Sequence, residues 1–361
     1  MMEDKNFCLS SYMAYRYLYK DGVDFFSGMR HFTLKATPLE SRQPVGSADE
    51  IDAALRRQMD EYYSQFGKIG ILLSGGMDSA ILASYLKPGT HAYTFVSPGA
   101  AVFDQDMERA SEYCEKYGLV RHIVPIGFDD YKAFTPLAMR QRCAPVHTIE
   151  PQIVKAAMMA KRDGVEMMII GDAADYVFGG MDKLMAKDWG YDEFVKRYYA
   201  VDPEEVLATP VDVSEPFRPF RLPDGKIDFM GFLEGLFPEE SYNSYYNAFA
   251  VAEMPYRDPY ETMTMRDKLD LGRIRGGDTK YLVRELYRMR FPERDVPEKI
   301  PMPRPVDAIF KDWMGPRRTE FRKDIDMNRL TGNQKWMLWC AELFLDIYDP
   351  QEMPQEKGKG C

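Results

Sequence analysis

The stretch KIGILLSGGMDSAILASYLK (68–87) decides the fold of this chain. Its first part, 68–76, is apolar up to a Gly-Gly turn, as in a buried strand, and 77–87 has the apolar spacing that predicts a helix. The glycines permit backbone conformations closed to other residues, so main-chain N–H groups can approach a ligand closely. The start of the helix adds unpaired N–H donors and a partial positive charge. The turn therefore favours a polyphosphate ligand.

Strand-like and helical segments continue to alternate beyond this stretch. The sequence predicts strands over 91–97, 121–126 and 165–172 and helices over 104–118 and 150–164. Strands that are apolar on both faces and separated by helices form a parallel sheet covered on both sides. Such sheets place their ligands at the carboxyl ends of the strands. We therefore expect an α/β fold with the binding site at that edge.

The pattern changes after residue 180. Residues 182–250 are rich in aromatic residues and proline and lack clear strand alternation. Helices are predicted over 278–290, with Asp278 or Thr279 as the N-cap, and over 332–348. A helical part is therefore expected to follow the sheet.

The composition excludes several classes of protein. Of the 361 residues, 45% are hydrophobic and 29% are charged, which is ordinary for a globular chain. The sequence has neither the ~18-residue apolar run of a membrane span nor the basic start and apolar core of a secretory signal. Five scattered cysteines without a CxxC pair indicate no disulfide framework or structural zinc, so we expect a cytoplasmic protein. The net charge of −10 argues against nucleic-acid binding.

The polar residues of the Gly-Gly turn suit a nucleotide phosphate with its metal. The hydroxyls of Ser74 and Ser79 can donate hydrogen bonds to phosphate oxygens. A bare phosphate would repel Asp78, but this carboxylate suits a Mg²⁺ ion that the phosphates share. The loop lacks the lysine that follows the second glycine in GxxxxGK[ST]. The alternative interpretation is a tight turn with serine caps.

Two motifs resemble a known family. SGGMDS (74–79) is similar to the PP-loop of ATP pyrophosphatases, which cut ATP into an adenylate and pyrophosphate. GDAADYVFGG (171–180) resembles the GEGxDExFGG element of the asparagine synthetase family, which also contains β-lactam synthetases and lasso-peptide cyclases. In that family the aspartates of the two motifs share a magnesium ion, which implies Asp78 and Asp175 here. The alternative is that Asp172 and Asp175 only cap a helix.

Weaker similarities extend the resemblance along the chain. Residues 9–32 resemble the segment that joins the glutaminase and synthetase domains in the family. PYRDPYET (255–262) resembles the family's RxPFLD stretch, and residues 277–305 resemble its KxLLR…RxK region. The implied fold is an α/β parallel-sheet PP-loop ATP pyrophosphatase domain, similar to adenine nucleotide α-hydrolases, with helical C-terminal additions. The implied parts are an N-terminal segment (1–60), a PP-loop core (61–255), a helical C-terminal part (256–349) and a flexible tail (350–361).

The chain also departs from the family pattern. Met2 and Glu3 stand where glutamine-using members have a catalytic cysteine, so we do not expect this chain to hydrolyse glutamine. Asp172 and Tyr176 replace the two glutamates of GEGxDE. The late catalytic lysine is not clearly present. Arg304 or Pro305 aligns with the position of this lysine. The residues that could replace it are Arg304, Lys299, Lys311 and Lys280. An arginine keeps the charge but cannot donate a proton in catalysis.

The resemblance implies a ligase that uses ATP and Mg²⁺. A substrate carboxylate would attack the α-phosphorus of ATP, and ammonia or an amine would then displace AMP to form an amide. The expected partners are a small carboxylate, an amine or ammonia donor and a separate glutaminase or pathway partner, without nucleic acid or membrane. Two alternatives stay open: a PP-loop enzyme that thiolates or aminates a nucleobase or tRNA, and an ATP-binding subunit without catalysis.

The expected site residues follow from the two motifs and the strand ends. The nucleotide would contact Leu73, Ser74, Gly75, Gly76, Asp78, Ser79, Val96, Ser97 and Gly171. Asp78 and Asp175 would bind the metal. Asp172, Lys280 and Arg304 are the expected catalytic residues. His147, Thr148 and Glu150 are candidates for the acceptor pocket.

Overall fold

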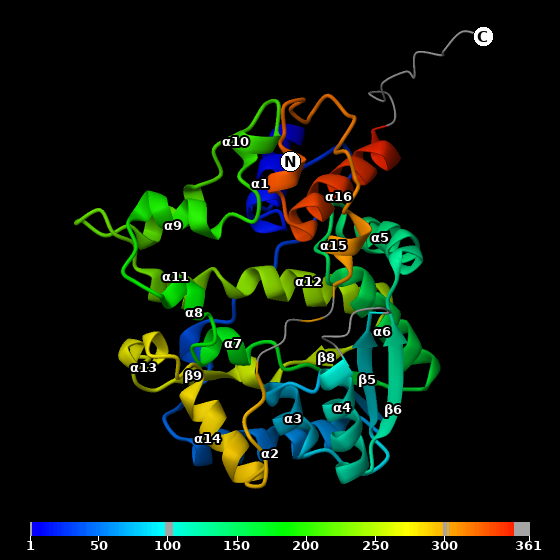
Figure 1. The fold of residues 1–361 in the computed structure, drawn as a ribbon, viewed down its shortest axis with the longest axis vertical. Coiled ribbons are helices and arrows are strands. Elements are labelled where there is room, and N and C mark those ends of the chain that lie inside the picture. Colours follow the sequence, from blue (N-terminus) through cyan, green and yellow to red (C-terminus); the bar gives the residue numbers. More distant parts are fainter. Residues whose placement is uncertain (1, 98–103, 299–301, 303, 350–361) are drawn as a thin grey trace.

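The structure, a computed structural model, describes residues 2–97, 104–298, 302 and 304–349. Its main sheet, in the lower half of the view in Figure 1, has five strands in the order β6-β5-β4-β7-β8, and all neighbouring strands are parallel. The strands are β4 (Ile69–Leu72), β5 (His91–Val96), β6 (Val120–Pro125), β7 (Met167–Ile169) and β8 (Tyr256–Arg257). The predicted α/β fold with a parallel sheet is therefore confirmed.

The middle strand β4 is buried on both faces and separates two hydrophobic cores. Ile69 and Ile71 pack into one core and Leu72 into the other, because side chains alternate between the faces of a strand. Gly70 lies so close to β7 that a Cβ atom there would be 2.6 Å from Met168 Sδ. A larger residue at this position would therefore have to displace the Met168 side chain.

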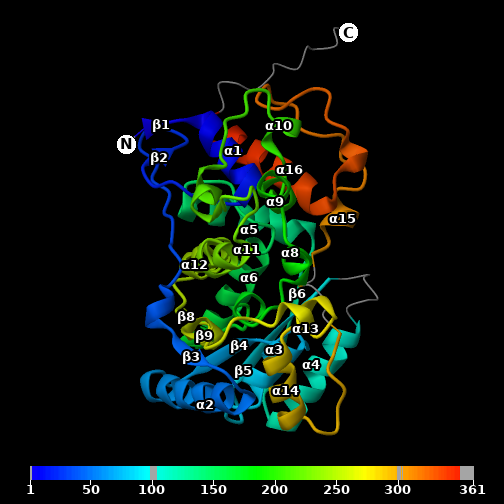
Figure 2. The same cartoon turned by 90° about the vertical axis from the view of Figure 1, so that its left-hand side faces the viewer.

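Helices cover both faces of the sheet (Figure 2). The core of Ile69 and Ile71 is closed by α2 (Ala48–Gln65), α3 (Met77–Ala83), α4 (Asp104–Tyr117) and α14 (Tyr281–Arg290). The core of Leu72 is closed by α5 (Phe128–Arg142), α6 (Glu150–Arg162) and α12 (Pro238–Val251).

Further helices extend the second core away from the sheet. Here α1 (Lys5–Tyr15) packs against α16 (Gly332–Tyr348), which begins with a capping box of Thr331 and Gln334. The other helices are α7 (Ala174–Val177), α8 (Asp182–Met185), α9 (Tyr191–Tyr198), α10 (Pro203–Val206), α11 (Phe229–Gly235), α13 (Leu271–Arg275) and α15 (Val306–Ile309). Two-stranded sheets pair β1 (Met2–Glu3) with β2 (Val23–Asp24) and β3 (Gln43–Val45) with β9 (Met263–Met265). Short 3₁₀ turns span Leu39–Ser41, Glu215–Phe220, Pro259–Thr262 and Met327–Arg329.

The predicted elements between 68 and 172 are all present, with shorter strands. The aromatic segment 182–250 folds into short helices that end in α12. The expected start of the helix over 278–290 was wrong, because the N-cap of α14 is Lys280 and not Asp278 or Thr279. Asp278 instead pairs with Arg273, at 2.6 Å between Arg273 Nη2 and Asp278 Oδ2. The two charges hold Asp278 away from the helix start.

The predicted division of the chain into four parts, with boundaries after residues 60, 255 and 349, remains a prediction. Across these boundaries, β8 joins the sheet beside β7, and β9 pairs with β3. Among the described residues, no helix combines the length and apolar character needed to span a membrane. The predicted tail, 350–361, lies outside the described residues.

Candidate active site

A cleft of about 840 Å³ opens at the carboxyl ends of β4, β5 and β7. This is the edge at which a parallel sheet of this kind binds its ligands. Of the predicted site residues, those that line the cleft are Leu73, Ser74, Gly76, Asp78, Ser79, Gly171, Asp172, Asp175, Lys280 and Arg304. One cleft thus brings together residues that lie more than 200 positions apart.

The loop between β4 and α3 is held by hydrogen bonds within its own sequence. Ser74 Oγ and Ser79 Oγ lie 3.0 Å apart, and the Gly76 N–H donates to Ser74 Oγ at 3.2 Å. Gly75 has a φ of +75°, and a Cβ atom there would lie 2.2 Å from the Asp106 carbonyl oxygen. Only glycine fits at this position without displacing the start of α4. The loop geometry is therefore fixed before any ligand binds.

Lys280 joins the two aspartates of the predicted metal site. Its Nζ lies 2.6 Å from Asp78 Oδ2 and 2.9 Å from Asp175 Oδ1. Burial alone would lower the pKa of Lys280, but the charges of Asp78 and Asp175 outweigh burial and hold that pKa above its usual value. Lys280 therefore stays a cation at neutral pH, between two carboxylates.

The backbone around this group is unusual at two positions. Lys280 itself has a φ of +50°, a left-handed conformation that costs a residue with a side chain about 1–2 kcal/mol. A Cβ atom at Gly180 would lie 2.3 Å from Asp175 Oδ1 and 3.0 Å from Lys280 Cδ. The final glycine of the second motif therefore leaves the space in which Asp175 and Lys280 meet.

The donor chemistry of this group fits a divalent cation. Asp78 and Asp175 come from two neighbouring strand ends, and both direct an oxygen to one positively charged atom. Carboxylate oxygens, together with phosphate oxygens, are the ligands that Mg²⁺ takes in nucleotide sites. A Mg²⁺ ion brought by a nucleotide would share these oxygens with Lys280.

Asp172 is held by two side chains of α12. Its Oδ2 accepts a hydrogen bond from Ser241 Oγ, and its Oδ1 accepts one from the Tyr245 hydroxyl at 3.4 Å. Behind it, the buried Asp258 accepts from the Ala173 N–H at 2.7 Å. Burial, with the charge of Asp172 added, raises the pKa of Asp258 well above its usual range. Hydrogen bonds from both sides thus fix the turn that carries Asp172.

Charged residues from distant segments also line the cleft. Arg16 Nη1 donates to both carboxylate oxygens of Glu240 at 2.8 Å. His147 and Arg304 line the cleft beside this pair. The loop that carries His147 is anchored at Val146, whose carbonyl oxygen accepts from the Tyr12 hydroxyl at 2.8 Å and from Trp336 Nε1 at 3.2 Å.

Some predicted residues do not reach the cleft. Gly75, Val96 and Ser97 are not among its lining residues, whereas Tyr93 and Phe95 are. Side chains alternate along β5, so the face that presents Tyr93 and Phe95 turns Val96 away. Alternation gives no such argument for Ser97, and the contact of Val96 and Ser97 with the nucleotide stays a prediction.

Other candidates lie close to the cleft without lining it. Glu150 is fully buried and lies 3.2 Å from Arg142 Nη1, so it belongs to an internal ion pair. Thr148 contacts Arg304, while Lys311 is exposed outside the cleft. Lys299 lies outside the described residues. Of the possible replacements for the late lysine, the described part of the chain thus places Arg304 and Lys280 in the cleft.

Sequence analysis missed several lining residues. Arg16, Glu240, Ser241 and Tyr245 all line the cleft. They come from the N-terminal segment and from α12, where no motif marks them. Glu240 and Ser241 are consecutive in α12, a helix that mixes polar and aromatic side chains throughout, so no sequence signal sets these two residues apart.

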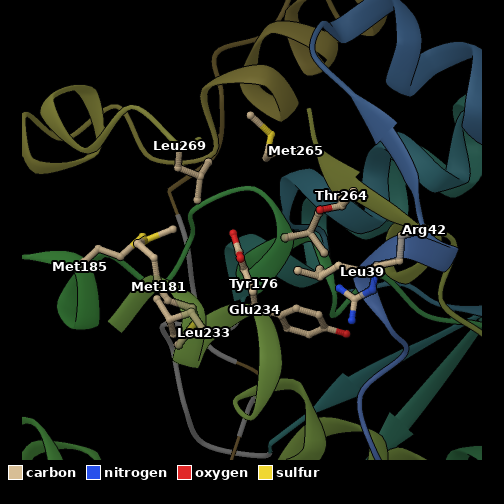
Figure 3. Close-up of a pocket in the computed structure, with 12 residues that line it drawn as sticks. Leu39, Arg42, Tyr176, Met181, Met185, Leu233, Glu234, Thr264, Met265 and Leu269 are labelled. Atoms are coloured by element: carbon tan, nitrogen blue, oxygen red, sulfur yellow. The ribbon is translucent and has the colours of Figure 1, made fainter. Parts of the chain in front are cut away.

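A second pocket lies behind Tyr176, which lines both cavities. Its volume is only about 20 Å³, enough for one water molecule. Figure 3 shows mostly apolar side chains around it, among them Met181, Leu233 and Leu269. The large cleft, and not this pocket, has the size of a ligand site.

Comparison with known proteins places the chain in a family. Two solved structures are similar to this chain. NMN synthetase from Francisella tularensis has 15% sequence identity and a TM-score of 0.28, over 71% of this chain and 100% of that chain. The U34-tRNA thiolase NcsA from Methanococcus maripaludis with its 4Fe-4S cluster has 15% identity and a TM-score of 0.24, over 65% of this chain and 75% of that chain. No curated protein matches the chain. The asparagine synthase family model matches residues 49–244, more than half of the sequence and both motifs. The chain therefore belongs to the asparagine synthase family.

Proposed function

We propose that this protein is an ATP-dependent carbon–nitrogen ligase, which adenylates a substrate carboxylate and then transfers ammonia or an amine to it. The observation that carries the proposal is the group of Asp78, Asp175 and Lys280 beside the phosphate loop. Family membership supports the same class of reaction. ATP and Mg²⁺ are the cofactors that the proposal requires.

In the first step a carboxylate oxygen of the substrate attacks the α-phosphorus, and the bond to the bridging oxygen of the β-phosphate breaks. The departing pyrophosphate carries the negative charge. Ser74, Gly76 and Ser79 would bind the phosphates, and Asp78 and Asp175 would hold Mg²⁺. The ion supplies charge neutralisation on the phosphates. Lys280 adds a fixed positive charge where this charge develops.

In the second step a nitrogen attacks the acyl carbon, AMP leaves and the nitrogen loses a proton. Asp172 lies in the cleft and accepts hydrogen bonds from Ser241 and Tyr245. We assign it the role of orienting the amine and accepting its proton. Free ammonia, an amine on the substrate or a separate glutaminase would supply the nitrogen.

The described cysteines, Cys8, Cys114, Cys143 and Cys340, are all unpaired, which supports a proposed cytoplasmic location.

Pyrophosphate–ATP exchange over a panel of carboxylic acids tests this function. Exchange should require Mg²⁺ and at least one acid, and Asp78→Asn should lower it about 100-fold or more. Asp224→Asn, an exposed carboxylate far from the motifs, is the matched control and should behave as wild type. If no acid supports exchange while ATP and Mg²⁺ still raise the melting temperature, the chain binds nucleotide without this catalysis.

A further inference from the structure

Two histidines and an aspartate meet beside the edge strand β6, outside the large cleft. His91 is the first residue of β5, whereas the cleft opens at the carboxyl ends of the strands. On the neighbouring strand β6, His122 is in register with Tyr93 (Figure 1). Side chains two apart on a strand, and side chains in register on neighbouring strands, lie on the same face of a sheet, so His91, Tyr93 and His122 share one face. The C-cap of α6, which covers that face, is Asp163.

Neighbouring side chains hold these groups in place. The His122 ring is close to parallel with those of His91 and Tyr93, with ring centroids 4.8 and 4.6 Å away and interplanar angles of 15° and 16°. The Tyr93 hydroxyl donates a hydrogen bond to Asp163 Oδ2 at 2.7 Å. The two imidazoles and the carboxylate are therefore oriented toward one another before any ligand binds.

The donor atoms of the three residues lie almost as close together as the ligands of one metal ion. His122 Nε2 lies 2.9 Å from His91 Nδ1, and His122 Nδ1 lies 3.4 Å from Asp163 Oδ2. One donor atom from each residue lies within 4.8 Å of the other two. Bonds of about 2.0–2.1 Å place two ligands of a tetrahedral Zn²⁺ about 3.3 Å apart. The two nitrogens would then separate by about 0.4 Å, and the carboxylate would move by at most about 1.5 Å.

A metal ion can replace the proton that joins the two rings. At 2.9 Å, one of the facing nitrogens donates a proton and the other accepts it. Neutral imidazole nitrogens are also ligands for transition metals, so both could bind an ion placed between them. The charges that act on His91 include the positive charge of Lys68, whose Nζ donates to the Asp163 carbonyl oxygen, and the negative charge of Asp163. Because Lys68 offsets Asp163, simple attraction between charges would not hold a cation here.

The donor set and its exposure select the kind of ion. Two imidazoles and one carboxylate suit Zn²⁺ and related transition metals, whereas Mg²⁺ and Ca²⁺ take oxygen ligands. The side chains of His122 and Asp163 are 21% and 33% exposed, so an ion can enter from the solvent. The same exposure leaves room for a water molecule as the fourth ligand.

We propose that His91, His122 and Asp163 bind one divalent transition metal ion of the zinc type, with water as the fourth ligand. The ion would connect β5 and β6 to the end of α6 and so stabilise the folded chain. The site is separate from the carboxylates of Asp78 and Asp175, and the inference does not depend on the proposed ligase function.

Zinc binding to the full-length protein tests the inference without nucleotide or acid. Metal-free protein is titrated with Zn²⁺ in competition with a chromophoric chelator, and excess Mg²⁺ is present to occupy sites made of oxygen ligands. We expect His122→Gln and Asp163→Asn each to weaken binding about 100-fold or more, because even residues that only orient a metal ligand contribute about 10- to 100-fold. Zn²⁺ at 100 times its dissociation constant should raise the melting temperature of wild type by about 3–4 °C and leave both variants unchanged.

The controls separate this site from other zinc ligands of the chain. Asp60→Asn, a change at an exposed aspartate of α2, is the matched control and should bind Zn²⁺ as wild type does. Asp78→Asn should also bind normally, because the cleft is not involved. Co²⁺ in place of Zn²⁺ should give the visible spectrum of a nitrogen and oxygen site, without the charge-transfer bands of thiolate ligands. Melting temperatures without metal show which variants are folded, and the exposed position of Asp163 makes Asp163→Asn the decisive one.

Three results would overturn the inference: no zinc binding by wild type, equal binding by wild type and folded Asp163→Asn, or a cobalt spectrum that shows thiolate ligands. Zinc held by the five cysteines or by the cleft would survive both substitutions and so give the second result. None of these measurements depends on pyrophosphate exchange. A failure of the ligase proposal is therefore distinguishable from a failure of the metal site.

Discussion

Replacing Lys280 by methionine tests whether its ammonium and a metal ion share the same two carboxylates. The variant keeps most of the side-chain volume but removes the ammonium that lies between Asp78 and Asp175. Removing one partner of a buried ion pair costs about 3–5 kcal/mol. The side chains of Asp78 and Asp175 are 22% and 27% exposed, so solvent screens the pair. We therefore expect a smaller loss of folding free energy, about 2–3 kcal/mol.

The corresponding change in melting temperature follows from the chain length. At about 2.1 cal/mol/K per residue, 361 residues give an unfolding entropy of about 0.8 kcal/mol/K, so the variant should melt about 3–4 °C below wild type. Added Mg²⁺ should restore this loss in Lys280→Met, since the ion would replace the ammonium. A concentration 100 times the dissociation constant would contribute about 2.7 kcal/mol. Wild type without nucleotide should respond much less.

Differential scanning calorimetry with and without Mg²⁺ measures both effects. Lys226→Met is the control, because Lys226 is exposed and lies 3.7 Å from Asp224. Equal melting temperatures for Lys280→Met and wild type, or an equal response of both to Mg²⁺, would refute the reasoning.

Three further perturbations have defined outcomes. Gly75→Ala should abolish ATP binding in calorimetric titration, because its Cβ would lie 2.2 Å from the Asp106 carbonyl oxygen; normal binding would contradict the rigid loop. Asp172→Asn should keep pyrophosphate exchange within about tenfold while amide product falls about 100-fold, and parallel losses would contradict its assignment to the second step. The pKa of Asp258 is higher in the folded protein than in the unfolded chain. The stability that Asp258 contributes is therefore present below its pKa in the unfolded chain and is lost as the pH rises through its pKa in the folded protein. Asp258→Asn should therefore gain melting temperature over wild type between pH 4 and pH 8, and a constant difference would contradict this.

The part of the site that lies on the parallel sheet could be predicted from the sequence. Gly75, Gly76 and Asp78 directly follow a buried strand, and Asp175 follows another, so the topology alone brings them to one edge. The positions of these residues depend on contacts between neighbours in the sequence, so the two short motifs are enough to predict them.

The remainder of the site depends on tertiary packing, which a single sequence does not encode locally. Arg16 reaches the cleft because α1 packs against α16, a contact between the two ends of the chain. The expected cap of α14 failed for a similar reason. The ion pairs of Lys280 with two aspartates over 100 residues away hold it in a left-handed conformation that no local preference favours.

The origin of Lys280 and Arg304 in the last third of the chain has a consequence for biosynthesis. A ribosome that has released only the first 250 residues has already exposed the glycine loop and both aspartates, yet neither basic side chain has emerged. The β8 strand that closes one edge of the sheet, and the pairing of β3 with β9, are also still missing. Until that point the cleft lacks the ammonium that lies between Asp78 and Asp175, and its sheet lacks one edge strand. We therefore expect the complete nucleotide site to form only after Lys280 and Arg304 have left the ribosome.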